Sequence, residues 1–403
     1  MKDKPAAGDR PTADAPAPRL RVALLGQYPE DPQRMYGGVE AVIAALAGEL
    51  ARRPDVDLHV VRCVPGVAAH TIERRPGMTL HWLPRRRLGR LTFHRRDVTL
   101  LLRCLDEIEP DIVHAHGTGL YAGAAIASRA PAVITAHGII RREAHMAVSL
   151  KDWLGWQLNI LYERYVLRHA PNVIAISPYV VREYASLLRG GFYLVENPVA
   201  EDYFKIFKHG EPGRILFAGL VIARKDPMTA IRAFAQARAR HPHARLRIAG
   251  ALDAEPAYAA AAQALAARLG VGDAVDFLGH LNEAAILEEY RACSVFLLSS
   301  VQETAPVVVE QALAAGRPCV VTNAGGAGFL LQEGETGFVV PVGDAAGLAR
   351  ALNRLLDEPA LYQRMMAQAR RDAEARFRVA NVAEQTLDVY ASILSPAAER
   401  RGE

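Results

Sequence analysis

Cysteine is scarce in this chain: four cysteines occur among 403 residues, and no two of them stand at a short, paired spacing. Such scattered cysteines argue against a disulfide framework and against a zinc site of the paired-cysteine type. They are typical of a protein that works in a reducing compartment. We therefore expect a cytoplasmic protein that binds no metal.

Long hydrophobic runs are also missing, although 51% of the residues are hydrophobic. Charged residues interrupt every apolar run, so none reaches the roughly 18 residues that a membrane-spanning helix needs. The formal net charge of +4 is too small to indicate a nucleic-acid partner. Residues 1–18 are rich in proline, alanine and charge and have no apolar centre. They predict a disordered tail, not a signal peptide.

What the chain does contain is a regular alternation of short β-branched runs and longer stretches rich in alanine, leucine and arginine. The strands expected are 19–26, 57–63, 80–83, 112–115, 132–136, 173–176, 192–195, 214–218, 245–249, 275–278, 294–298, 318–322 and 337–340. Helices are expected between them, for example over 39–52, 226–240 and 258–269. Strands that alternate with helices indicate parallel sheets with right-handed crossovers.

These strands are too many for one comfortable sheet, which predicts an α/β protein with two doubly wound, Rossmann-like domains and a cleft between them. The polar segment 199–212 carries proline and glycine and is the expected hinge. It separates a first domain over 19–198 from a second over 213–380. Residues 381–403 are expected to form a helix that crosses back to the first domain. Ligands of such sheets bind at the carboxyl ends of the strands, which makes the cleft the expected site.

The most informative segment is 299–316, which follows a buried strand. Thr304 and Pro306 are residue types that begin helices, and Gly316 is a type that ends them, so a helix is expected over 307–315. The free N–H groups at its start would attract an anion. Glu303 beside them would repel phosphate and is better suited to hydroxyl groups. These residues alone leave two interpretations open, a sugar-nucleotide site and an ordinary turn with a solvated carboxylate.

Two other loops suit a phosphate. Gly37 and Gly38 open the helix after the first strand, where glycine lets the backbone approach a ligand closely. A plain tight turn is the commoner reason for such a pair. Arg224 and Lys225 follow the first strand of the second domain and could neutralise a diphosphate as its oxygens gain charge. A solvated basic loop is the alternative there.

Histidines stand at the ends of two neighbouring strands of the first domain: His114 and His116 at one, His137 at the next. Metal binding by them has little support, because no carboxylate or cysteine stands at a suitable spacing. We expect His137 to form a hydrogen bond to a sugar and His114 to be a structural residue.

The densest basic run begins at Arg85 and ends at Arg96. Such a surface could contact an anionic membrane or an acidic acceptor, which would make the protein peripheral to a membrane. A solvated arginine-rich face is the commoner explanation.

Taken together, these segments resemble the retaining, GT-B-fold glycosyltransferases of glycosyltransferase family 4, the group 1 glycosyltransferases. The resemblance runs from about residue 21 to residue 394, and the order and spacing of the motifs make it specific. The matching stretches are 37–40, 111–116, 135–138, 174–177, 196–199, 224–225, 248–250, 277–279, 303–306 and 333–340.

The resemblance implies a nucleotide-diphosphate sugar, UDP- or GDP-linked, as donor substrate on the second domain and a hydroxyl acceptor on the first. The acceptor would be a glycan, a lipid-linked or a small molecule. Transfer would retain the anomeric configuration without a metal bound to the protein or a permanently bound cofactor. The catalytic residues implied are His137, Lys225 and Glu303. The donor-binding residues implied are Gly37, Gly38, Arg224, Lys225, Gly250, His280, Leu281, Glu303, Thr304, Ala305, Pro306, Val307 and Gln311.

The chain departs from the family pattern at three positions. Leu220 stands where the family has an arginine at the diphosphate, a charge that Arg224 could replace. Gln311 stands where the family has a second acid, and its carbonyl oxygen can still accept from ribose hydroxyls. Phe329 stands where another acid is usual, with no polar substitute. These departures keep open a catalytically impaired partner subunit, and less so a sugar epimerase or phosphorylase. The sequence leaves the sugar, the base, the acceptor and the oligomeric state undetermined.

Overall fold

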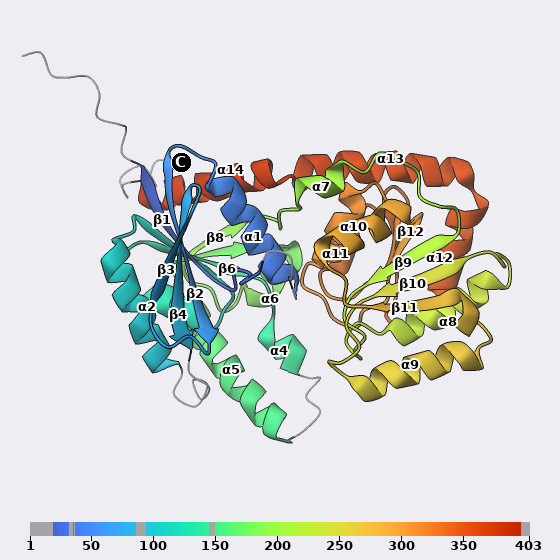
Figure 1. The fold of residues 1–403 in the computed structure, drawn as a ribbon, viewed down its shortest axis with the longest axis horizontal. Helices are drawn as coiled ribbons and strands as arrows, with labels where there is room; N and C mark the ends of the chain where they lie inside the picture. The colour runs from blue at the N-terminus through green and yellow to red at the C-terminus, as the bar shows by residue number, and fades with distance from the viewer. Residues whose placement is uncertain (1–18, 32–34, 36, 86–93, 145–149, 396–403) are drawn as a thin grey trace, which may run out of the picture.

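The structure is a computed structural model that describes residues 19–31, 35, 37–85, 94–144 and 150–395. Residues 1–18, the predicted tail, and residues 86–93, most of the basic run, lie outside the described residues. The described chain forms two α/β units side by side, each built on its own sheet (Figure 1). The expected fold class, two doubly wound Rossmann-like domains, is confirmed.

The first sheet has the strand order β3-β4-β2-β1-β5-β6-β7-β8. Its strands are β1 Leu20–Leu25, β2 Val56–Pro65, β3 Thr71–Arg75, β4 Met78–Arg85, β5 Ile112–His116, β6 Ala132–Ala136, β7 Asn172–Ala175 and β8 Gly191–Leu194. Neighbours pair in parallel, except that β3 runs antiparallel to β4. We did not predict β3. It is a polar edge strand exposed along most of its length, so it lacks the buried apolar run that marks the others.

Helices cover both faces of this sheet. They are α1 Gly38–Leu50, α2 Arg95–Ile108, α3 Leu120–Ala127, α4 Ile140–Glu143, α5 Leu150–His169 and α6 Pro178–Tyr184. Helices α2 and α3 pack on one face, whereas α1 shares the other with the last helix of the chain, α14 (Val379–Leu394). The carboxyl ends of the strands stay free of these layers.

The second sheet is parallel throughout, in the order β11-β10-β9-β12-β13-β14. Its strands are β9 Arg214–Ala218, β10 Arg245–Ala249, β11 Val275–Gly279, β12 Val295–Leu298, β13 Cys319–Thr322 and β14 Gly337–Val340. Its helices are α8 Pro227–Arg238, α9 Pro256–Arg268, α10 Glu283–Ala292, α11 Val307–Ala314, α12 Ala345–Asp357 and α13 Pro359–Arg376. Every strand that we predicted overlaps an observed one, because strands buried on both faces form short apolar runs that are easy to recognise.

The chain passes between the two domains twice, and the two passages lie together. The first precedes the short helix α7 (Glu201–Phe204) and the second joins α13 to α14. The Val199 N–H donates to the Phe377 carbonyl over 2.8 Å, and Arg376 forms a 2.6 Å ion pair with Glu196. Beyond this point α14 packs on α1 (Figure 1). Its Tyr390 is fully buried in the first domain.

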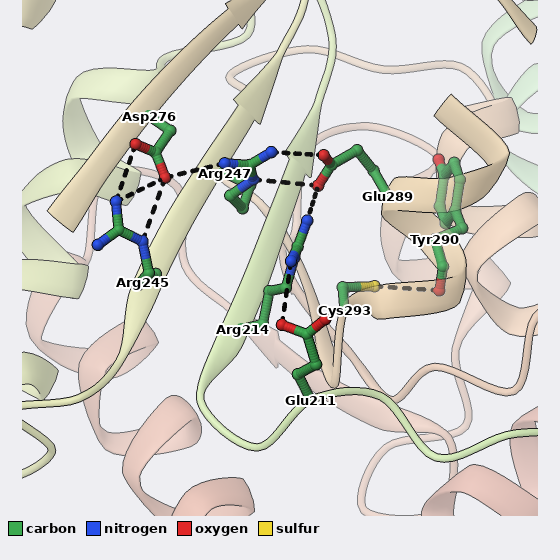
Figure 2. Close-up of polar contacts among 8 residues, drawn as sticks. All are labelled: Glu211, Arg214, Arg245, Arg247, Asp276, Glu289, Tyr290 and Cys293. Atoms are coloured by element: carbon green, nitrogen blue, oxygen red, sulfur yellow. Dashed lines mark hydrogen bonds and ion pairs between the residues drawn. The ribbon is translucent and has the colours of Figure 1, made fainter. Parts of the chain in front are cut away.

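A polar network holds α10 to the second sheet near the amino ends of β9, β10 and β11 (Figure 2). Glu289 of α10 bridges Arg247 over 2.6 Å and Arg214 over 3.0 Å. Asp276 pairs with Arg245 over 2.9 Å and with Arg247 over 3.0 Å. Burial raises the pKa of the Glu289 carboxyl, but the two arginines outweigh it and the pKa lies below its usual value. The network therefore anchors α10 at the amino ends of the strands. The functional loops gather at the opposite, carboxyl ends.

Candidate active site

A cavity of about 490 Å³ lies between the domains at the carboxyl ends of β9, β10 and β11. The first domain contributes the start of α1, and the second contributes the loops after the three strands together with α11. The predicted donor-binding residues that line it are Gly37, Gly38, Arg224, Lys225, Gly250, His280, Leu281, Val307 and Gln311. The tertiary structure thus brings together residues from both halves of the chain.

A buried carboxylate beside two cations forms the charged centre of the site. Lys225 Nζ lies 2.6 Å from Glu303 Oε1, and the Arg224 guanidinium lies 3.6 Å from Glu303 Oε2. The Ser300 hydroxyl donates to Glu303 Oε1 over 2.6 Å. Burial raises the pKa of Glu303, but Lys225, Arg224 and Ser300 together outweigh burial and bring it below its usual value. Glu303 is therefore an ionised, oriented hydrogen-bond acceptor.

The loops that carry these groups are joined to each other. Asp226 caps α8 by accepting from the Thr229 N–H over 3.2 Å, which places the two preceding cations just outside the helix. The Ser299 hydroxyl donates to the Asp226 carbonyl over 2.6 Å, and the Val301 N–H donates to the Arg224 carbonyl over 2.9 Å. Lys225 and Glu303 are 78 residues apart, yet these bonds hold their loops as one unit.

The starts of two helices meet at one side of the cavity. A Cβ on Gly38, the first residue of α1, would lie 3.1 Å from the side chain of Val307, the first residue of α11. Helix starts carry free N–H groups and partial positive charge, so two of them next to each other beside a cavity are suited to an anion. Thr304, Ala305 and Pro306 are buried and are not among the lining residues of this cavity. The predicted contact of their amides with phosphate stays a prediction.

His137 ends β6 on the first-domain side and is tied to a second histidine. His116 Nδ1 lies 2.7 Å from His137 Nε2, and His116 Nε2, which is buried, has no partner among the described residues. A lone pair without a partner costs less than an N–H without one, so the proton of His116 belongs on Nδ1. His137 then accepts at Nε2 and carries its own proton on Nδ1. Burial lowers the pKa of His137 to about 4, so the ring is neutral.

His114 is a structural residue, as expected. Its Nδ1 lies 2.6 Å from the hydroxyl of Tyr390 on α14, and its Nε2 lies 2.7 Å from the Thr135 hydroxyl. Both ring nitrogens are therefore satisfied inside the first domain. Burial lowers the pKa of His114 to about 3.

These buried histidines predict a stability that falls on acidification. Burial, followed by the charges of neighbouring histidines, holds the pKa of His116 well below 6.5, as burial does for His114. The unfolded chain binds their protons first, so their contribution is complete above about pH 6.5 and is lost as the pH falls from there toward the pKa in the folded protein, which is about 3 for His114. Within this pH range, each histidine should lower the free energy of unfolding by about 1.4 kcal/mol for every pH unit of acidification. The free energy of unfolding, measured with urea at pH 7.5 and at pH 5, should be lower at pH 5. The difference between the two pH values should be smaller in His116→Gln. It should be unchanged in His243→Gln, the control, because His243 is exposed. Equal stability at both pH values would contradict the prediction.

Glu143, at the end of α4, was not predicted as a site residue. Burial raises its pKa, and the charge of Glu303 raises it too, whereas Arg224 and Lys225 act in the opposite direction. The first domain therefore brings a second carboxyl group close to the charged centre of the second. The signal in the sequence was an acid six residues after His137, in the segment that follows a strand end.

Two consecutive polar residues of α11 face different sides of the helix. Gln311 lines the cavity, and its Oε1 accepts from the Tyr290 hydroxyl over 3.3 Å. Glu310 is fully buried on another side of the helix, where its Oε1 accepts from Asn197 of the linker over 3.2 Å. Burial raises the pKa of Glu310 well above its usual value, so the group is neutral. Gln311 therefore occupies the cavity side, and Glu310 cannot substitute there for the missing acid.

Phe329 acquires a role that the sequence did not suggest. The residue is 44% exposed, and the guanidinium of Arg182 on α6 lies 5.9 Å from the centre of its ring. Arg182 also lies 5.3 Å from the Tyr179 ring, on the same helix. Arginine over an aromatic face is a favourable pair. Phe329 thus joins the second domain to the first instead of offering a carboxylate.

Comparison with known proteins gives the family. The sequence model described as Glycosyltransferase Family 4 matches residues 36–202, and that of Glycosyl transferases group 1 matches residues 199–372. The two matches adjoin at the linker and together span both domains. The chain belongs to the family 4, group 1 glycosyltransferases.

Similar proteins support the family and the fold. D-inositol 3-phosphate glycosyltransferase of Streptomyces avermitilis is 35% identical over 184 residues, which are 44% of this chain and 39% of that protein. The match therefore spans about two fifths of that relative's length. Sucrose-phosphate synthase from Thermosynechococcus elongatus superposes with a TM-score of 0.76 at 20% identity, over 93% of this chain and 99% of that one. Anabaena HepE in complex with UDP and glucose superposes with a TM-score of 0.73 at 20% identity, over 93% of this chain and 100% of that one. The architecture of this chain is GT-B.

No helix among the described residues is long and apolar enough to cross a bilayer. The contact of residues 85–96 with an anionic surface stays a prediction.

Proposed function

We propose that this chain transfers a sugar from a nucleotide-diphosphate sugar to a hydroxyl group of an acceptor, with retention of the anomeric configuration. The observation that carries the proposal is the contact of Lys225 with buried, ionised Glu303 at the edge of a cavity between two domains. Cations, two neighbouring helix starts and an oriented carboxylate are what a diphosphate joined to a sugar requires.

The diphosphate would lie in the cavity beside the starts of α1 and α11 and against the loop that carries Arg224 and Lys225. As its bond to the sugar breaks, negative charge accumulates on the leaving oxygen. Lys225 has three N–H donors, of which one reaches Glu303, so it can also contact a phosphate oxygen. Arg224 adds a second positive charge. These groups stabilise the departing diphosphate more than the intact donor, which is the condition for faster transfer.

The sugar would lie between Glu303 and the first domain. Glu303 accepts hydrogen bonds, whereas the neutral His137 offers its Nδ1 proton to a sugar hydroxyl. The carboxyl group of Glu143 comes from the acceptor side. Gln311 replaces an acid at the ribose, where its carbonyl oxygen keeps one lone pair after accepting from Tyr290.

We further propose a UDP-sugar as donor, with no metal required. The structural likeness to HepE, whose complex holds UDP and glucose, supports this choice. The bases would be distinguished near His280 and Leu281, which line the end of the cavity after β11. The acceptor would bind on the first domain.

The first test is a thermal-melt screen of the protein against UDP, GDP, ADP and TDP. A ligand at a hundred times its dissociation constant adds about 2.7 kcal/mol to stability, which a melt detects. We expect the shift with UDP to be the largest. The anomer released when the matching donor sugar is slowly hydrolysed, followed by NMR, then reports retention or inversion. No shift with any nucleotide would overturn the proposal in favour of a catalytically impaired partner subunit.

A further inference from the structure

Three side chains of metal-binding types converge on one face of the first sheet. His70 precedes β3, His81 lies in β4, and Cys104 lies in α2, which packs on that face. Their ligand atoms all lie within 4.8 Å of one another. We propose that these three residues form a transition-metal site that takes Zn²⁺ and joins the β3–β4 hairpin to α2.

The distances match a tetrahedral zinc site closely. Zinc binds imidazole nitrogen at about 2.0–2.1 Å and thiolate sulfur at about 2.3 Å, so two such nitrogens stand about 3.3 Å apart and nitrogen and sulfur about 3.6 Å. His70 Nε2 and His81 Nδ1 are 3.1 Å apart. The Cys104 sulfur lies within 4.8 Å of a ligand nitrogen of each histidine, so it would have to move by about 1.3 Å at most to complete three corners. His70, the half-exposed member, leaves the fourth corner to water.

Each histidine is oriented by further polar groups. On the side away from His70, His81 Nε2 lies 3.0 Å from His59 Nδ1, and His59 Nε2 lies 3.5 Å from an Asp57 oxygen. His70 Nδ1 lies 3.8 Å from Glu107 Oε2. A histidine that binds metal donates its other N–H to an acceptor, as His81 can do from Nε2 to His59. The lone pair on His81 Nδ1 is then directed toward His70.

The donor set selects the metal. Imidazole and thiolate suit zinc and other transition metals, whereas magnesium and calcium prefer oxygen. Binding of the metal would release the thiol proton of Cys104. None of the three ligands lines the cavity between the domains, and α2 lies on the outer side of the first domain (Figure 1), so the role is structural.

The test is a titration of the metal-stripped, full-length protein with Co²⁺. We expect one equivalent to produce the near-ultraviolet thiolate-to-cobalt absorption, and Zn²⁺ to abolish it. Cys104→Ser should remove the band. Cys63→Ser is the matched control, because Cys63 is also buried in the first domain but is not one of the three ligands. His59→Gln should weaken binding 10- to 100-fold by removing the support of His81.

Two results would overturn the site. One is the absence of the charge-transfer band with stoichiometric Co²⁺. The other is a band that Cys104→Ser and His70→Gln leave unchanged, which would place the metal elsewhere. If Cys104→Ser does not fold, His70→Gln decides, because the His70 side chain is 26% exposed and its replacement disturbs little packing.

Discussion

Replacing Lys225 by alanine is expected to lower kcat by a hundredfold or more, and Glu303→Gln is expected to do the same. Lys225 supplies charge where the leaving diphosphate gains it, and the loss of one such partner typically costs about a hundred- to a thousandfold. Glu303→Gln keeps the shape of the side chain but removes the charge that Lys225 and Arg224 share. The measurement is steady-state turnover with the donor identified by the melt screen.

The matched control for this pair is Lys205→Ala. Lys205 directly follows α7, has a side chain that is 68% exposed, pairs with exposed Asp202 and does not line the cavity. Its replacement should leave kcat unchanged. Melting curves of each variant show whether lost turnover reflects lost folding. Turnover near the parent level in both Lys225→Ala and Glu303→Gln would remove these two residues from the mechanism.

Gly250→Ala is expected to destabilise the second domain by about 3 kcal/mol or more and to abolish donor binding. A Cβ on Gly250 would lie 1.8 Å from the carbonyl oxygen of Gly219, far inside van der Waals contact. Because Gly219 begins the loop that carries Arg224 and Lys225, either that loop must move or the strands must separate. Gly250 therefore has a packing role at the donor site, in addition to the ligand contact predicted for it.

The control for this prediction is Gly48→Ala in α1, where an added Cβ meets nothing within 4 Å. Alanine has the higher helix propensity, so this variant should be neutral or slightly more stable. Urea unfolding measures both variants, and nucleotide melts measure donor binding. A Gly250→Ala protein with parent stability and a parent melt shift would show that the two loops tolerate the displacement.

The acceptor-side residues show how far sequence reasoning reached and where it stopped. His137 was recognisable because it ends a strand, and strand ends face the cleft. The protonation state of His137 could not be predicted from the sequence. It follows from the contact with His116, 21 residues away, and from the burial of both rings. Glu143 was missed for a related reason. Its role depends on the charges of Arg224, Lys225 and Glu303, which another domain supplies.

The cluster of His70, His81 and Cys104 escaped sequence reasoning for the same reason. Rules for metal sites rely on ligands at short spacings within one loop. These ligands come from a hairpin and a helix that the sheet brings together, and the hairpin strand β3 was itself too polar to be predicted.

The sequence by itself determined the two sheets, the positions of all their strands except the polar edge strand β3, and the family, because buried strands and their turns leave local patterns of apolar residues, glycine and proline. Only the tertiary structure decided that Glu310 turns to the linker while Gln311 faces the cavity, and that Phe329 contacts Arg182. It also decided that Lys225 holds Glu303 in its ionised form. The physical reason is that burial and charge at one residue depend on groups distant in the chain, whose approach local patterns do not encode.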